Sequence, residues 1–173
     1  DAVISTLPAP QNLDLMKKFP ILKKTLGTAS YDACIALMFI FDEKPKNIPY
    51  FFEYYNQQGM LSWMAAGSNL RFWTAQTKGN YSNKNINKDK ILLKDEIFQE
   101  IEKAIYQLEP NIKINFHSLH IWKYAKVTKV CSGPQIDPKF PIVVAGDFME
   151  GASVESAFSS GEKAAELILE RLH

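Results

Sequence analysis

The stretch FPIVVAGDFMEGASVESAFSSGEKAAELILERL, residues 140–172, predicts a strand, a sharp turn and a helix in direct succession. Residues 141–145 are apolar throughout, which is typical of a parallel strand covered on both faces. Gly146 permits a close backbone approach, and Asp147 stands where the strand ends. Ser153 is a good N-cap for the following helix. Ligands of open α/β sheets bind at the carboxyl ends of strands, so Asp147 and the helix N-terminus are expected to face one crevice.

A carboxylate beside a helix N-terminus suits a ligand that has two kinds of polar group. The carboxylate accepts hydrogen bonds from hydroxyl groups, and the positive end of the helix dipole favours an electron-rich carbonyl or a phosphate. The alternative is that Asp147 only caps a turn or a helix. The residue types alone do not separate these two interpretations.

The remainder of the chain predicts strands and one long amphipathic helix. The Asn- and Lys-rich stretch 79–90 is expected to be an exposed loop. After Pro8 and Pro10, residues 10–19 have Leu13, Met16 and Phe19 at helical spacing, which predicts a short helix. One face of a helix is traced by Leu93, Ile97, Ile101, Ile105 and Leu108. Strands are expected at residues 2–7, 31–41, 59–68, 70–78 and 111–127, with the third and fourth as a hairpin and the first buried.

The apolar pattern of residues 111–127 changes parity near Ser118, which predicts a bulge or a change of neighbours. Ile112, Ile114 and Phe116 precede the change, and Leu119, Ile121, Ala125 and Val127 follow it. Three amphipathic side chains then share one face: His120, Trp122 and Tyr124. They indicate either a cavity wall or an ordinary half-buried sheet face. His117 and His120 are an odd number of residues apart and point to opposite faces of a strand, so no metal site is expected.

The composition limits the classes of function. The 173 residues are 46% hydrophobic with a formal net charge of +1, which is enough for one sizeable core and gives no general reason to bind nucleic acid or an anionic membrane. The chain has no apolar run of ~18 residues. Cys34 and Cys131 are too few for a disulfide framework, which favours the cytoplasm. The chain begins directly in a strand-like apolar run, so we expect it to be a piece of a longer protein.

Three segments carry a resemblance to a known family: DAVISTLPAPQ (1–11), LHIWKYAKV (119–127) and VVAGDFMEGASVESAFSSGEKAA (143–165). They resemble the carboxyl-terminal portion of FAD-dependent amine oxidase-like enzymes, most closely the renalase-like branch. The resemblance implies an α+β fold, with an antiparallel substrate-domain sheet and helices, plus a remnant parallel strand pair and a C-terminal helix from a dinucleotide-binding domain. The implied domains are residues 1–20 (FAD-binding remnant), 21–135 (substrate-binding) and 136–173 (carboxyl-terminal FAD-binding strand and helix).

The resemblance also implies the site residues. Gly146, Asp147, Ser153 and Val154 would bind FAD, with Asp147 on the ribityl hydroxyls and the helix N-terminus at the flavin N1/C2=O edge. A small-molecule substrate, either a reduced nicotinamide isomer or an amine, would lie against His120, Trp122 and Tyr124. No side chain is expected to act as a catalytic acid or base. Ile121 and Lys123 stand where the renalase-like pattern usually has Arg.

The expected activity is therefore that of an FAD-dependent oxidoreductase that transfers hydride to the flavin. Two alternatives remain: another enzyme of the amine oxidase superfamily, of the desaturase or protoporphyrinogen oxidase type, or a non-catalytic module that binds a ligand or a protein.

No G-x-G-x-x-G fingerprint follows an expected strand, although such enzymes carry one at their amino terminus. The expected partner is thus the missing amino-terminal FAD-binding segment of the same protein, and the fragment alone is expected to be inactive. Residues 3–7 and 142–146 are expected to pair as parallel strands. Their open edge would permit self-association.

Overall fold

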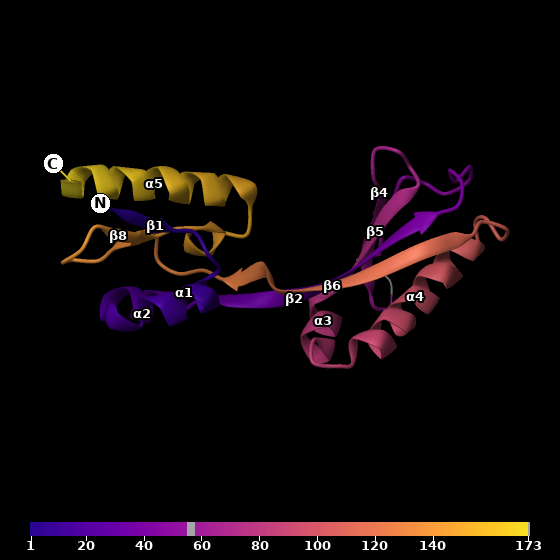
Figure 1. The fold of residues 1–173 in the computed structure, drawn as a ribbon, viewed down its shortest axis with the longest axis horizontal. Helices are drawn as coiled ribbons and strands as arrows, with labels where there is room; N and C mark the ends of the chain where they lie inside the picture. Colours follow the sequence, from indigo (N-terminus) through magenta and orange to yellow (C-terminus); the bar gives the residue numbers. More distant parts are fainter. Residues whose placement is uncertain (55–57, 173) are drawn as a thin grey trace. The chain divides into compact units, whose positions relative to one another are not determined.

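The computed structural model describes residues 1–54 and 58–172, and the chain folds into two compact units. Unit 1 comprises Asp1–Tyr31 and Lys126–His173, and unit 2 comprises Asp32–Ala125. Both segments that the sequence assigns to FAD binding, 1–20 and 136–173, belong to unit 1. Their assignment to functional domains stays a prediction. The elements in chain order are β1 (Val3–Ser5), α1 (Ala9–Leu15), η1 (Met16–Lys18), α2 (Pro20–Leu26), β2 (Ser30–Phe41), β3 (Phe51–Glu53), β4 (Leu61–Ala66), β5 (Phe72–Thr77), α3 (Gly79–Asn85), α4 (Lys90–Tyr106), β6 (Ile114–Lys129), β7 (Gln135–Ile136), β8 (Ile142–Val144), η2 (Asp147–Met149) and α5 (Val154–Leu172) (Figure 1).

Unit 1 is built on a three-stranded sheet in the order β1-β8-β7. β1 pairs in parallel with β8, with Val3 opposite Ile142 and Ser5 opposite Val144, and β7 pairs antiparallel to β8. The predicted parallel pair is confirmed. The prediction of a buried strand at residues 2–7 is wrong, because Val3 is 52% exposed and Ile4 is 43% exposed. β1 is an edge strand in this sheet, so one of its edges has no neighbouring strand.

Helices cover the central strand of this sheet on both faces. Val143 and Ala145 pack with Ala164 and Ile168 of α5, while Val144 belongs to a second cluster that includes residues of α1 and α2. Successive side chains of a strand point to opposite faces, which explains the apolar run without alternation. Figure 1 shows α5 on one side of β1 and β8, and α1 and α2 on the other.

Unit 2 contains a five-stranded sheet in the order β3-β4-β5-β2-β6. β3 with β4, β4 with β5 and β5 with β2 are antiparallel pairs, so the predicted hairpin of β4 and β5 is confirmed. The predicted helix is α4, whose Leu93, Ile97, Ile101 and Ile105 are completely buried. Leu108 was expected on the same face, but it lies beyond the end of α4 and is exposed.

Alternate residues of β2 form the core of unit 2 together with α4. Ile35, Leu37, Phe39 and Phe41 are buried, and the Phe39 and Phe41 rings contact Trp73 of β5. This alternation leaves the even-numbered residues of β2 on the sheet face opposite α4.

The predicted long strand is β6, and its change of parity is visible in the packing. Ile112 and Ile114 before the change, and Leu119 and Ile121 after it, all pack in the core of unit 2. His117 stacks on Phe98 of α4, with ring centroids 4.0 Å apart. The side chain of Phe116 lies outside the part that the structure describes.

The exposed loop predicted at residues 79–90 is wrong in its first half, because Gly79–Asn85 forms α3. The buried face of α3 is polar, so it shows no hydrophobic period. The Ser82 and Thr77 hydroxyls are 2.7 Å apart, and Asn85 Nδ2 donates to the Tyr81 carbonyl at 2.7 Å. Internal hydrogen bonds thus satisfy side chains that usually indicate an exposed loop.

The structure confirms the predicted α+β class, with an antiparallel sheet, a small parallel strand pair and a C-terminal helix. Cys34 and Cys131 are both free thiols. Among the described residues, no helix is long and apolar enough to cross a membrane.

Candidate functional site

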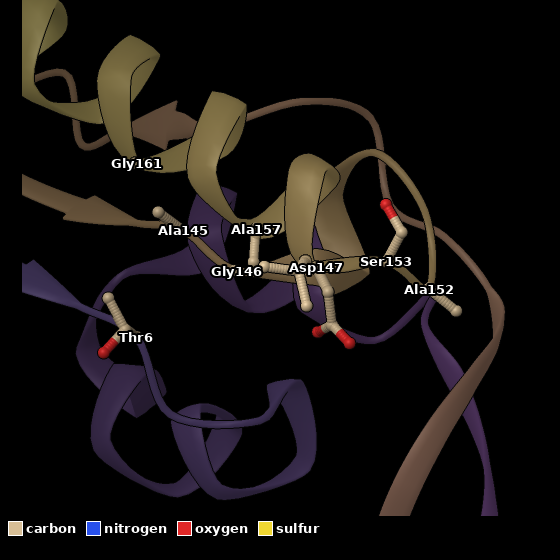
Figure 2. A pocket seen from close by; sticks show the side chains of 9 residues that line it. Thr6, Ala145, Gly146, Asp147, Ala152, Ser153, Ala157 and Gly161 are labelled. Atoms are coloured by element: carbon tan, nitrogen blue, oxygen red, sulfur yellow. The ribbon is translucent and has the colours of Figure 1, made fainter.

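A cleft of about 530 Å³ lies in unit 1 where three elements begin or end. The parallel strands β1 and β8 both end at it, and α5 begins at it (Figure 2). This is the position at which ligands bind in open α/β sheets. The structure brings together all four residues predicted to bind a cofactor. The described lining residues are Thr6, Ala145, Gly146, Asp147, Ala152, Ser153, Val154, Ala157 and Gly161.

Gly146 has a backbone conformation that residues with a side chain rarely adopt. Its φ is +153°, and a Cβ atom there would lie 2.5 Å from Cε1 of the buried Phe148 ring. The Gly146 N–H donates to Ser160 Oγ of α5 at 2.9 Å, and the Gly146 carbonyl accepts from the Met149 N–H at 3.1 Å. Both backbone groups therefore have protein partners. Gly146 shapes the cleft and fixes the start of the turn, but it has no free donor for a ligand.

Asp147 is half-buried, and within residues 1–54 and 58–172 its carboxylate accepts no hydrogen bond. Its main-chain carbonyl accepts from the N–H groups of Glu150 and Gly151. Asp137, in the same unit, shows the contrasting arrangement: its carboxylate accepts from the N–H groups of Lys139 and Phe140 at 2.9 and 3.1 Å. Asp137 is thus a turn cap and Asp147 is not.

The electrostatic surroundings of Asp147 include the Tyr31 phenol. Burial raises the pKa of Tyr31 to about 12, the hydrogen bond from the Ala9 N–H opposes this rise, and the negative charge of Asp147 adds to it. The Tyr31 hydroxyl accepts the Ala9 N–H at 2.9 Å. Tyr31 therefore remains neutral at physiological pH.

The N-terminus of α5 is capped as the sequence predicts. Ser153 Oγ accepts the Ser156 N–H at 3.1 Å, and the Ser153 carbonyl accepts the Ala157 N–H at 3.1 Å. The Glu155 carboxyl lies at the same helix end, and its pKa is lowered by the hydrogen bond from its own backbone N–H and then by the Ser153 hydroxyl. Val154 lines the cleft at the first helical position, where the backbone N–H has no partner inside a helix.

Sequence reasoning missed Thr6, which lines the cleft, and Ser160, which accepts the Gly146 N–H behind it. Thr6 lies across the cleft from Ser153 (Figure 2). Asn12, which is completely buried, holds the segment around it by accepting from the Ser5 hydroxyl and donating to the Leu7 carbonyl, both at 2.6 Å. Ser160 has no distinctive sequence pattern, because serine is common inside amphipathic helices. Its hydroxyl is buried, however, and a buried hydroxyl needs a hydrogen-bond partner.

The residues predicted to bind substrate lie in unit 2, on the sheet face opposite α4. Trp122 and Tyr124 line a pocket of about 260 Å³ together with Cys34, Gln76 and Ala125. His120 does not line it, but its ring centroid is 4.3 Å from that of Trp122. The three side chains thus share one face, as predicted. No group of three or more His, Cys, Asp or Glu side chains in the described part is placed to hold a metal ion.

The fold of this chain is found in a known enzyme. A solved structure of an oxidoreductase from Methanosarcina mazei matches it with a TM-score of 0.58 at 16% sequence identity. The match covers 96% of this chain and 43% of that one, so this chain spans less than half of that enzyme's length. No protein-family model matches the sequence, and no curated protein matches it. The chain therefore has the fold of part of an oxidoreductase.

Proposed function

We propose that unit 1 supplies part of the FAD site of an oxidoreductase of the renalase-like type. The observation that carries this proposal is the cleft itself. A carboxylate with no capping role, Asp147, stands at the shared end of β1 and β8, beside the N-terminus of α5. The fold shared with part of an oxidoreductase supports the proposal.

The lining residues suit the ribityl chain and the flavin edge. Asp147 would accept hydrogen bonds from ribityl hydroxyls, and the Thr6 and Ser153 hydroxyls would be further polar contacts. The Val154 N–H and the positive end of α5 would bind an electron-rich carbonyl, with a stabilisation of ~0.3–2 kcal/mol for negative charge placed there. Alanine and glycine on the remaining wall, among them Ala157 and Gly161, let a planar ring lie close to the backbone.

FAD would supply the hydride acceptor for oxidation of the substrate. The protein's part is to orient the two molecules and to stabilise negative charge at the flavin N1/C2=O edge through the α5 N-terminus. This requires no side chain as acid or base. In unit 2, Trp122 is the residue that we expect to hold a planar substrate by stacking, with His120 and Tyr124 beside it. A reduced nicotinamide isomer or an amine is the substrate proposed for a renalase-like enzyme.

The diphosphate and adenosine of FAD need contacts that the cleft does not offer, because its described lining residues include no Lys or Arg. Further polypeptide, the missing amino-terminal FAD-binding segment of the same protein, would supply them. Two surfaces of unit 1 support this. Among the described residues, one edge of β1 has no neighbouring strand, and α5 exposes a second apolar stripe besides its buried one: Val154, Phe158, Leu169 and Leu172.

The test is an Asp147→Ala variant of the protein extended by that amino-terminal segment. We expect FAD affinity to fall about 10- to 100-fold, because a hydrogen bond to a charged group is worth ~1.5–3 kcal/mol. The melting temperature should stay close to that of the parent. FAD affinity is measured by titration of flavin fluorescence and by the flavin-to-protein ratio after gel filtration. The 173-residue chain alone should bind FAD weakly, since few contacts remain to offset the entropy of association.

Asp137→Ala is the matched control, because it removes a buried carboxylate from the same unit. It should lower the melting temperature and leave FAD affinity unchanged. The opposite pattern, with Asp147→Ala reducing stability and not FAD affinity, would assign Asp147 to a structural role. An extended protein that retains no flavin would leave the non-catalytic module as the function.

A further inference from the structure

The sheet face opposite α4 carries uncharged side chains over most of its width. β2 and β5 pair Ala36 with Gln76, Met38 with Thr74 and Ile40 with Phe72. These side chains alternate with those buried against α4, so they share the other face. Met38 is 42% exposed and Phe72 is 51% exposed. Large apolar side chains on an open sheet face indicate a surface that is covered in use.

A pocket of about 430 Å³ lies on this face, separate from the pocket at Trp122. Its described lining residues are Met38, Phe39, Ile40, Gly67, Phe72, Trp73, Thr74 and Ser118. None of them carries a charge, and several of their polar groups are already engaged. Trp73 Nε1 donates to the Leu70 carbonyl at 2.9 Å, and the Gly67 N–H donates to the Phe72 carbonyl at 2.7 Å. Besides Trp73 Nε1, the side-chain polar groups of its described lining are the hydroxyls of Thr74 and Ser118.

The two pockets follow one another along the same strands. Cys34 of β2 lies with Trp122 and Tyr124 in one pocket, and Ile40 of β2 lies with Ser118 in the other. Residues 34 and 40 are six steps apart on β2, so the two pockets together extend over about 20 Å. Neither set of described lining residues includes Asp, Glu, Lys or Arg.

We propose that this face binds a neutral, predominantly apolar small molecule, with a planar group at Trp122 and an apolar part in the pocket between Met38, Ile40 and Phe72. The proposal deepens the proposed function and rests on it, because it names the substrate class for the face of unit 2 to which the proposed function assigns substrate binding. A protonated amine or a phosphate would lose its hydration here without gaining an opposite charge. Of a reduced nicotinamide, the uncharged dihydropyridine ring fits this face and any phosphate would have to lie outside it, whereas a protonated amine does not fit.

The test uses three probes that share a naphthalene ring and differ in charge. N-phenyl-1-naphthylamine is neutral, 8-anilinonaphthalene-1-sulfonate adds one negative charge to it, and 1-naphthylmethylamine is protonated at neutral pH. We expect the neutral probe to bind with a rise in its fluorescence, and the sulfonate to bind at least about tenfold more weakly. The cationic probe should not displace the neutral one. Equal binding of the sulfonate, or displacement by the cation through a cation–π contact with Trp122, would overturn the proposal.

Two substitutions on the same sheet face locate the binding site. Phe72→Asp places a charge in the pocket, and Phe51→Asp places one on β3, outside the pocket, at a side chain of similar exposure (51% and 53%). Phe72→Asp should weaken binding of the neutral probe about tenfold or more, and Phe51→Asp should leave it unchanged. Phe72→Ala introduces no charge, so it controls for a loss of folding in Phe72→Asp. It should weaken binding of the neutral probe by a smaller factor than Phe72→Asp does. Equal effects of the two Asp variants would place the probe elsewhere.

The alternative is that this face binds a second copy of the chain. In that case, binding of the neutral probe would weaken as the chain concentration rises, and the proposal would fail. Binding that is independent of chain concentration supports a small molecule. The assay requires no flavin, so its outcome is separate from that of the FAD test. Retention of FAD together with no binding of the neutral probe would overturn the substrate class alone.

Discussion

Replacing Gly146 by alanine should destabilise unit 1 by roughly 2–6 kcal/mol, the sum of two separate effects. The first is backbone strain, because φ is +153° and alanine avoids this region at a cost of ~1–3 kcal/mol. The second is overlap of the new Cβ with Phe148, whose Cε1 lies 2.5 Å away. The Phe148 ring is 1% exposed and cannot move into solvent, so overpacking costs a further ~1–3 kcal/mol. Relief by backbone movement would break the bond from the Gly146 N–H to Ser160.

The two units can be observed separately in this experiment. The three tryptophans, Trp63, Trp73 and Trp122, all belong to unit 2, so their fluorescence during urea unfolding reports that unit. Hydrogen exchange of the backbone amides of α5 reports unit 1. We expect Gly146→Ala to speed exchange in α5 and to lower its free energy of opening by the amount given above.

Gly161→Ala is the matched control within the same cleft. A Cβ atom at Gly161 meets nothing within 4 Å, and the residue lies inside α5, so alanine should stabilise the helix by ~0.5–1 kcal/mol. A destabilisation by Gly146→Ala of less than about 1 kcal/mol would refute the reasoning, because neither the strain nor the overlap would then be real.

Two further predictions concern a histidine in unit 2 and the edge strand of unit 1. The pKa of His117 is lowered by burial and then by Lys94, while Asp95 and Glu102 raise it, so the unfolded chain takes up a proton more readily than the folded one. Unit 2 should therefore lose stability as the pH falls below about 6.5, and His117→Gln should flatten this dependence in urea titrations that follow tryptophan fluorescence. The unpaired edge of β1 should make the isolated chain self-associate, so that its apparent mass in light scattering rises with concentration, whereas Ile4→Lys should hold it at the monomer mass. Equal masses for parent and variant at all concentrations would exclude this edge as the contact.

Elements with a strong hydrophobic period could be predicted from the sequence, and elements with a polar interior could not. α4 was predicted because four isoleucine or leucine residues recur every fourth position and all are completely buried. α3 was missed because its buried side chains are Ser82 and Asn85, whose burial depends on hydrogen bonds and not on apolar contact. The exposure of β1 was also missed. Its apolar composition is that of a covered strand, and the absence of a neighbour on one side is a property of the sheet.

The residues of the candidate site also differ in how well the sequence predicts them. Those that lie close together in the sequence could be predicted, and the one that lies far from them could not. Gly146, Asp147, Ser153 and Val154 fall within nine consecutive residues, so a strand, a turn and an N-cap were enough to place them together. The parallel pairing of β1 with β8 came from family resemblance, because no local pattern links strands so far apart in the chain. Thr6 follows from that pairing: once β1 is parallel to β8, the residue after β1 must lie beside the residues after β8. The position of the cleft could thus be predicted from the sequence. Thr6 would have been included if the register of β1 with β8 had been extended by one residue.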